Sequence, residues 1–339
     1  SCKNLSRNVR QIAEMIKNEG FQIVHCHGSR ANLVGLLLKA RLDMPFVTTV
    51  HSDYRLDYLG RPWHKLTYGT INTYCVRRIE NHICVADSMA DMLIDRGFDP
   101  QTLFTLYNGV DFGRDSRPVD KIEFCRSVGL EVKEDNVIFG IAARLSPVKD
   151  VGTLIRAFSY AQMTCPNIRL LIAGEGEQRQ ELEQLALECC SFGSVAFAGW
   201  LKDTDSFYNA IDVNMLTSLS EGFPYALPEG ARMSCATISS RVGGVPVLIE
   251  HGVTGLLFEP GNVKKLSEYM VRLASDPTLR KELGSALYEK TLREFSLEAM
   301  VNKQIDIYET LLRRAGRKHR ERDGVLICGA YGKGNAGDD

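Results

Sequence analysis

Two carboxylates eight positions apart flank a Gly-Phe-Pro turn in the segment Glu221-Gly-Phe-Pro-Tyr-Ala-Leu-Pro-Glu229. Upstream, a strand-like run ends in Arg144-Leu-Ser-Pro-Val-Lys149, which supplies two cations. Carboxylates accept hydrogen bonds from the vicinal hydroxyls of a ribose or another sugar, and an arginine with a lysine neutralises a diphosphate. Neither segment is specific alone, because an isolated Arg-x4-Lys pair usually consists of surface charges. Together they predict a nucleotide-sugar site.

The two cations are expected at the mouth of a helix. The run 137–142 is predicted as a strand, followed by a loop and by a helix that begins near Asp150. Free backbone amides in the first turn of that helix would then lie beside Arg144 and Lys149. Cations and free amides at one helix start favour the binding of phosphate.

The glutamate pair is expected around the start of a second helix. Pro224 suits a first helical turn, where its missing N–H costs nothing and its φ is already helical. Glu221 would then lie in the preceding loop and Glu229 inside the helix, with the amides of Phe223 and Tyr225 at the positive end of the helix dipole. The alternative is that both acids only favour a helix N-terminus. Glu229 lies too far along the helix for a cap.

The length and charge of the chain narrow its range of functions. Its 339 residues exceed one ordinary core and suit two domains. Lys and Arg number 41 against 42 Asp and Glu, so no global basic field favours nucleic acid. We therefore expect no nucleic-acid partner, and any anion site must be local.

The cysteines and the hydropathy pattern indicate the cytosol. The ten cysteines are scattered without a Cys-x-x-Cys spacing, and neither a secretory leader nor an apolar run of about 18 residues occurs. We expect a cytoplasmic protein, and peripheral contact with the inner face of the plasma membrane is compatible with this pattern. Residues 1–20 have the pattern of an amphipathic helix in place of an opening strand, so we also expect an N-terminally truncated chain.

Short β-branched runs alternate with helical patterns, as in parallel βαβ units. In the first series the predicted strands are 21–25, 46–51, 82–86 and 103–107, and the predicted helices are 31–41 and 63–78. After a turn-rich stretch, the second series has predicted strands at 137–142, 169–173, 195–198, 213–216 and 237–239. Each series suits a doubly wound sheet, so ligands are expected at the carboxyl ends of strands, in a cleft between two domains.

The predicted domains follow these series. They are a first domain at 1–111, a second at 112–296, a helix at 297–315 that returns to the first, a basic linker at 316–323, and the start of a further domain at 324–339. A basic run can also touch anionic lipid, but a solvated tether is our preferred interpretation. Residues 332–337 form a literal G-x-G-x-x-G, yet the helix and acid of a dinucleotide site do not follow it.

Between residues 20 and 315 the chain resembles the retaining glycosyltransferases of the GT-B fold, family 4, also called glycosyl transferases group 1. Arg144 to Lys149 matches the family's diphosphate clamp, and Glu221 to Glu229 matches its Glu-x7-Glu motif. The resemblance implies an α/β protein of two Rossmann-like, doubly wound parallel-sheet domains that face a cleft. The family's first strand and glycine-rich loop would lie before Ser1. Residues 329–338 are similar to the opening of polysaccharide pyruvyl transferases.

The resemblance assigns roles to individual residues. It implies that Glu229 holds the ribose hydroxyls and Glu221 a hydroxyl of the transferred sugar. The remaining donor-binding residues are Gly222, Phe223, Pro224 and Tyr225. His51 ends a predicted strand where family members carry a histidine near the reacting carbon of the donor, so it is predicted to be catalytic with Arg144, Lys149 and Glu221. A lone histidine at a strand end is otherwise usually structural.

No metal or other cofactor is expected. His25-x-His27 has a metal-ligand spacing, but no Asp or Cys partner accompanies it, and the chain has no Asp-x-Asp motif. Arg144 and Lys149 would therefore replace a divalent ion at the leaving group. Gly174-Glu-Gly176 lacks the third glycine of a dinucleotide fingerprint and is predicted to be a tight strand-to-helix turn, which argues against a nicotinamide dehydrogenase.

The function implied is metal-independent transfer of a hexose, with retention, from a nucleoside-diphosphate sugar to a hydroxyl acceptor. The expected acceptor is a cell-surface or cell-wall polysaccharide or a lipid-linked precursor of it. One alternative is a GT-B-fold epimerase that acts on a UDP-sugar. Another is a non-catalytic scaffold for a fused pyruvyl transferase domain.

Overall fold

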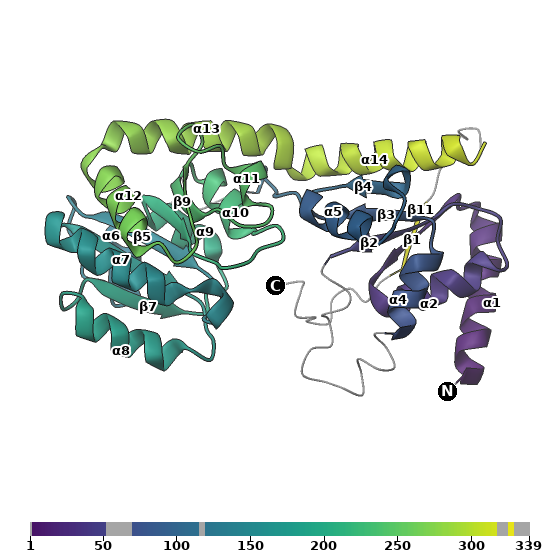
Figure 1. The fold of residues 1–339 in the computed structure, drawn as a ribbon, viewed down its shortest axis with the longest axis horizontal. Helices are drawn as coiled ribbons and strands as arrows, with labels where there is room; N and C mark the ends of the chain where they lie inside the picture. Colours follow the sequence, from purple (N-terminus) through teal and green to yellow (C-terminus); the bar gives the residue numbers. More distant parts are fainter. Residues whose placement is uncertain (1, 52–69, 115–118, 317–324, 329–339) are drawn as a thin grey trace. The chain divides into compact units, whose positions relative to one another are not determined.

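The computed structural model describes residues 2–51, 70–114, 119–316 and 325–328. The chain forms two compact α/β units, each with a parallel sheet between helices (Figure 1). One comprises Ser1–Tyr107 with Met300–Asp339, and the other Asn108–Ala299. The predicted limits at residues 111 and 296 lie a few residues from these divisions.

The first unit is built on a five-stranded sheet in the order β11-β1-β2-β3-β4, in which every strand pair is parallel. Its strands are β1 (Ile23–His27), β2 (Phe46–Val50), β3 (Asn81–Cys84), β4 (Leu103–Thr105) and β11 (Val325–Cys328). Its helices are α1 (Cys2–Glu19), α2 (Gly28–Lys39), α4 (Thr70–Arg78) and α5 (Asp87–Asp95). Helices on both faces bury the central strands, so even their polar side chains are buried, with Thr48 of β2 and His82 of β3 at most 2% exposed.

The helix predicted at 297–315 is α14 (Leu297–Arg314), and its C-terminal part covers the first sheet. Ile307 and Leu311 pack with Ile23 of β1 and Val47 of β2 in one buried cluster. Apolar side chains at this helical spacing form one face, so burial of that face fixes the helix on the sheet.

The C-terminal segment joins the first sheet. The segment expected to start a further domain contains β11, which pairs with β1 from Val325 opposite Ile23 to Cys328 opposite Cys26. This pairing uses the backbone donors and acceptors that an edge strand would otherwise leave open. Residues 317–323 of the basic linker predicted at 316–323 and the glycine-rich segment at 332–337 lie outside the described residues, so the further domain stays a prediction.

The second unit has a six-stranded sheet in the order β10-β9-β8-β5-β6-β7. Its strands are β5 (Val137–Ala142), β6 (Ile168–Ala173), β7 (Val195–Gly199), β8 (Val213–Leu216), β9 (Ala236–Ser240) and β10 (Leu256–Phe258). Its helices are α6 (Lys121–Ser127), α7 (Val151–Thr164), α8 (Arg179–Cys189), α9 (Thr204–Ala210), α10 (Ala226–Arg232), α11 (Val245–Leu248), α12 (Val263–Ser275) and α13 (Pro277–Phe295). The strand order reverses at β5, so the loops after β5 and β8 meet at a switch point, where ligands bind in such sheets.

Buried apolar clusters cover both faces of this second sheet. On one face α7 and α12 contribute Phe158 and Met270 to the larger cluster, and on the other α9 contributes Phe207 and Tyr208. All four side chains are at most 1% exposed. Within the described residues, no helix has both the length and the apolarity to cross a lipid bilayer.

Candidate active site

The loop after β5 makes a sharp turn that carries Lys149. Pro147–Lys149 forms a short 3-10 turn, and α7 begins two residues later at Val151. Between them Asp150 has φ 46° and ψ 45°, in the left-handed region that residues other than glycine rarely adopt. The strained residue lets the chain change direction at once into α7. The helix start predicted near Asp150 therefore agrees with the structure.

Lys149 and Glu221 form an ion pair at the switch point. Their Nζ and Oε1 atoms are 2.7 Å apart, and the two side chains are 24% and 9% exposed. The Ser218 hydroxyl donates to the same carboxylate oxygen. One half of the cationic clamp and one of the two predicted carboxylates are thus in direct contact, although 72 positions separate them in the chain.

Backbone contacts hold the two loops of this ion pair together. The hydroxyl of Thr217 donates to the Lys149 carbonyl over 2.8 Å, and the Leu219 amide donates to the Val148 carbonyl over 2.8 Å. The Ser240 hydroxyl in turn donates to the Ser218 carbonyl over 2.7 Å. The loop after β8 is therefore fixed to the loop after β5 and to β9, so Lys149 and Glu221 have little freedom to separate.

Arg144 is more exposed than Lys149 and lies against a different loop. Its side chain is 72% exposed, and its Nη2 atom is 3.8 Å from Glu177 Oε2, at the start of the connection to α8. An exposed pair at this distance gains little energy. The guanidinium group can therefore leave Glu177 for an anionic ligand at small cost.

The Gly174-Glu-Gly176 turn lies against the backbone next to Arg144. A Cβ atom on Gly174 would meet the Ala143 carbonyl oxygen at 1.9 Å, and one on Gly176 would meet the Leu145 carbonyl oxygen at 2.1 Å. The Leu145 amide donates to the Glu175 carbonyl over 2.9 Å. Both glycines are thus required by close backbone approach in the tight turn that the sequence predicted.

The helix that carries Glu229 begins later than predicted. It was expected to start at Pro224, but α10 begins at Ala226. The Leu227 amide bonds to the Pro224 carbonyl, three residues back, and the first bond of α-helical spacing joins the Glu229 amide to the Tyr225 carbonyl at 3.0 Å. The amides of Phe223 and Tyr225 therefore precede the helix, and with only seven residues its dipole adds less than we expected.

A glycine pair after β9 supports the segment from Glu221 to Tyr225. The Gly244 amide donates to the Gly222 carbonyl over 3.0 Å, and a Cβ atom on Gly243 would meet the Glu221 carbonyl oxygen at 1.7 Å. On the other side the buried Phe223 ring packs against Phe295, with 5.6 Å between ring centroids. Backbone and aromatic contacts together set the position of Glu221.

Glu229 is partly buried on α10, and its surroundings change its protonation. Burial raises the pKa of the Glu229 carboxyl above its usual value, and the nearby Tyr208 hydroxyl partly opposes this effect. Asp205 raises this pKa further, whereas Arg232 and Arg114 lower it. These four groups form the surroundings of the carboxyl, and sequence reasoning singled out none of them.

His51 belongs to the first unit, whereas the other candidate residues belong to the second. It follows β2, is exposed, and its Nε2 atom is 3.2 Å from His27 Nδ1. His25 lies behind His27, with 4.2 Å between ring centroids. The nitrogens of His25 contact the hydroxyls of Tyr308 at 2.6 Å and Thr49 at 2.7 Å. No local pattern predicts the contact with Tyr308, which is 283 positions away.

His25 is structural in this arrangement, and its protonation is expected to weaken the fold. Burial lowers its pKa from 6.5 to about 3, and the neighbouring His27 and His51 add to this effect. The unfolded chain then binds more protons than the folded chain between about pH 6.5 and pH 3, so the free energy of unfolding falls as the pH falls through that range.

The substitution His25→Gln is therefore expected to remove part of this pH dependence. Calorimetric melting at pH 7 and pH 4.5 measures it, and Tyr160→Phe on an exposed side chain is the control. An equal pH dependence of the melting temperature in wild type and His25→Gln would contradict this account of His25.

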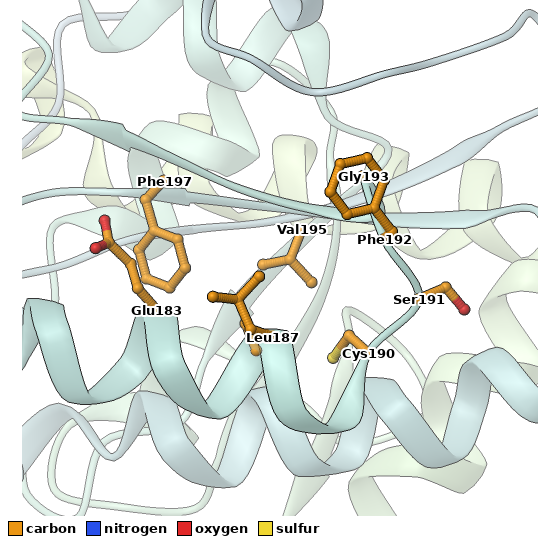
Figure 2. A pocket seen from close by; sticks show the side chains of 9 residues that line it. Glu183, Leu187, Cys190, Ser191, Phe192, Gly193, Val195 and Phe197 are labelled. Atoms are coloured by element: carbon orange, nitrogen blue, oxygen red, sulfur yellow. The ribbon is translucent and has the colours of Figure 1, made fainter.

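Among the described residues, no group of three or more His, Cys, Asp or Glu side chains is placed to share a metal ion. A hollow of 320 Å³ lies between α8 and the edge strand β7, and Leu187, Phe192 and Phe197 are among the side chains that line it (Figure 2). None of the predicted site residues lines it.

Comparison with known proteins identifies the family. Residues 1–114 match the model "Glycosyltransferase Family 4", and residues 126–290 match the model "Glycosyl transferases group 1". Together the two matches cover most of the chain, and they support a GT-B glycosyltransferase. The matches divide between the two units in the same way as the two sheets, which confirms the predicted fold class.

Two similar proteins are named for a UDP-galactose donor and for capsular polysaccharide biosynthesis. The chain is 24% identical, over 91% of its length and 81% of the relative's, to UDP-Gal:alpha-D-GlcNAc-diphosphoundecaprenol alpha-1,3-galactosyltransferase of Escherichia coli. It is 23% identical, over 87% of its length and 78% of the relative's, to a capsular polysaccharide biosynthesis glycosyltransferase, CapM, of Staphylococcus aureus.

Solved structures share the fold of this glycosyltransferase. The HepE protein of Anabaena, crystallised with UDP, superposes with a TM-score of 0.74 at 21% identity, over 90% of this chain and 82% of HepE. A glycosyltransferase of Rickettsia africae superposes with a TM-score of 0.73 at 20% identity, over 91% and 82% of the two chains.

Proposed function

We propose that this glycosyltransferase moves a sugar from a nucleoside-diphosphate sugar to a hydroxyl acceptor with retention of configuration. The observation that carries the proposal is the Lys149–Glu221 pair, because it joins a diphosphate-binding cation to a sugar-binding carboxylate at 2.7 Å. It lies at the switch point of a doubly wound sheet, the usual place for a nucleotide.

In the proposed reaction, negative charge builds on the departing diphosphate as the sugar becomes oxocarbenium-like. Lys149 is held in place before the reaction by Glu221, and the exposed Arg144 is free to approach, so the two cations stabilise that charge without a metal ion. Glu221 would accept a hydrogen bond from a hydroxyl of the transferred sugar. Glu229 would accept hydrogen bonds from the two ribose hydroxyls. His51 is proposed to face the reacting carbon.

The proposed acceptor is a polysaccharide or a lipid-linked precursor of one, at the inner face of the plasma membrane. Support comes from relatives that act in capsular polysaccharide synthesis and on a diphosphoundecaprenol-linked sugar. The proposed fusion to a pyruvyl transferase-like domain fits such a pathway, since pyruvyl groups decorate polysaccharides.

A donor panel tests the proposal. Thermal shift with UDP-, GDP- and ADP-sugars is expected to find one stabilising class, and transfer assays with the anomeric product read by NMR should show retention. Epimerised donor formed without acceptor would overturn the proposal in favour of an epimerase. Absence of binding to every donor would indicate a non-catalytic scaffold.

Donor affinity is expected to fall at acid pH because Glu229 must be ionised to accept hydrogen bonds from both ribose hydroxyls. Burial raises the pKa of Glu229, so affinity should start to fall at a higher pH than an exposed glutamate would cause. Calorimetric titration with the best nucleoside diphosphate from pH 8 to pH 5 measures this. In Glu229→Gln this fall of donor affinity at low pH, the acid limb of binding, should disappear. An acid limb that persists unchanged would contradict the assignment of Glu229.

A further inference from the structure

Two short helices of the second unit carry facing polar side chains beneath the proposed ribose site. Asp205 and Tyr208 lie three positions apart on α9, and Glu229 and Arg232 lie three positions apart on α10. Side chains at this spacing share one face of a helix. The two helices therefore present two pairs of groups to one another.

One of these pairs is a closed ion pair. The Arg232 guanidinium donates to the Asp205 carboxylate, and the side chains are only 8% and 10% exposed. Arg232 also donates to the Arg114 carbonyl over 3.1 Å, and Arg114 Nε is 3.6 Å from Asp205. Asp205 and Arg232 thus neutralise each other's charge, and their contact fixes the register of α9 against α10.

That register places Tyr208 beside Glu229. The Tyr208 side chain is 1% exposed, and its hydroxyl makes no well-formed hydrogen bond with any described residue. A buried hydroxyl that lacks a well-formed hydrogen bond costs stability, and phenylalanine would fill the same space without this cost. Its neighbour Glu229 is an acceptor whose pKa the hydroxyl lowers, which means that it favours the ionised carboxylate.

We propose that Tyr208 is a positioning residue that donates a hydrogen bond to the Glu229 carboxylate when the donor binds, and so directs that carboxylate at the ribose diol. The inference rests on the proposed function and adds to it the group that orients Glu229. With one lone pair of the carboxylate held by Tyr208 and Arg232 engaged by Asp205, the remaining lone pairs of Glu229 face the two ribose hydroxyls.

Tyr208→Phe tests the inference because it removes one oxygen and little else. We expect an unchanged or slightly higher melting temperature, and a Kd for UDP, GDP or ADP, whichever binds best, that rises about five- to tenfold. The Kd for the 2′-deoxy form of the same nucleotide should change less. The acid limb of binding should move to higher pH, since the hydroxyl that lowers the pKa of Glu229 is gone.

The substitution of Tyr160, an exposed tyrosine on α7, by phenylalanine is the matched control and should leave every value unchanged. In the Glu229→Gln background, Tyr208→Phe should have little further effect. A Kd equal to that of wild type, or an equal loss for ribo- and deoxyribonucleotide, would overturn this inference alone. A wild-type protein that binds none of the three nucleoside diphosphates would overturn the proposed function as well.

Discussion

Lys149→Ala is expected to lower kcat about a hundredfold while the protein stays folded, because each pre-organised group that stabilises a leaving charge contributes about 3 kcal/mol. Lys149 is held ready by Glu221 at 2.7 Å and by the backbone contacts of its loop. The ground state of the donor carries less charge on the leaving oxygen than the transition state does. The loss should therefore appear mainly in kcat and less in KM.

The control for Lys149 must separate the lost cation from the carboxylate that it leaves behind. Glu221 is only 9% exposed, so in Lys149→Ala its carboxylate would keep the hydrogen bond from the Ser218 hydroxyl but would have no cation beside it. The double variant Lys149→Ala/Glu221→Gln removes that unpaired charge, and it should recover melting temperature without recovering turnover. Lys265→Ala, which breaks a surface pair with Glu268, should leave the rate unchanged. Normal turnover in a folded Lys149→Ala protein would refute the proposed role.

Local sequence patterns were sufficient for the loop after β5 and for every strand except β10, which was not predicted. The apolar run at 137–142 is β5, and the start of α7 follows Asp150 as expected, because buried parallel strands and helix starts have short-range signatures. The predicted start of α10, at Pro224, was two residues too early, because a proline suits a turn before a helix as well as the first helical residue.

Contacts between distant segments could not be predicted in the same way. The pairs Lys149–Glu221 and His25–Tyr308 depend on which strands and helices are neighbours in space. The pattern predicts most of the strands, but the order β8-β5-β6 is set by the packing of the whole sheet. Tyr208 carries no motif at all, and only the register of α9 against α10 reveals its place beside Glu229.

The position of the turn after β9 also depends on tertiary structure, because its Gly243 lies against the backbone of Glu221. Gly243→Ala is expected to displace Glu221 and reduce transfer at least as much as the loss of Lys149. Gly243 has φ 45°, and a Cβ atom there would come within 1.7 Å of the Glu221 carbonyl oxygen. A clash with backbone cannot be relieved by a rotamer change, so the loop must move, at about 1–3 kcal/mol of stability.

Gly252→Ala separates this clash from the ordinary cost of a left-handed residue. Gly252 has φ 81°, but nothing lies within 4 Å of the added Cβ position, so its substitution should lower stability by only about 1 kcal/mol and leave the rate intact. Melting temperature, kcat and donor Kd measured on both variants make the comparison. If Gly243→Ala matches Gly252→Ala in all three, the turn does not position Glu221. If only Gly243→Ala loses donor binding and turnover, the backbone contact behind Glu221 is part of what forms the site.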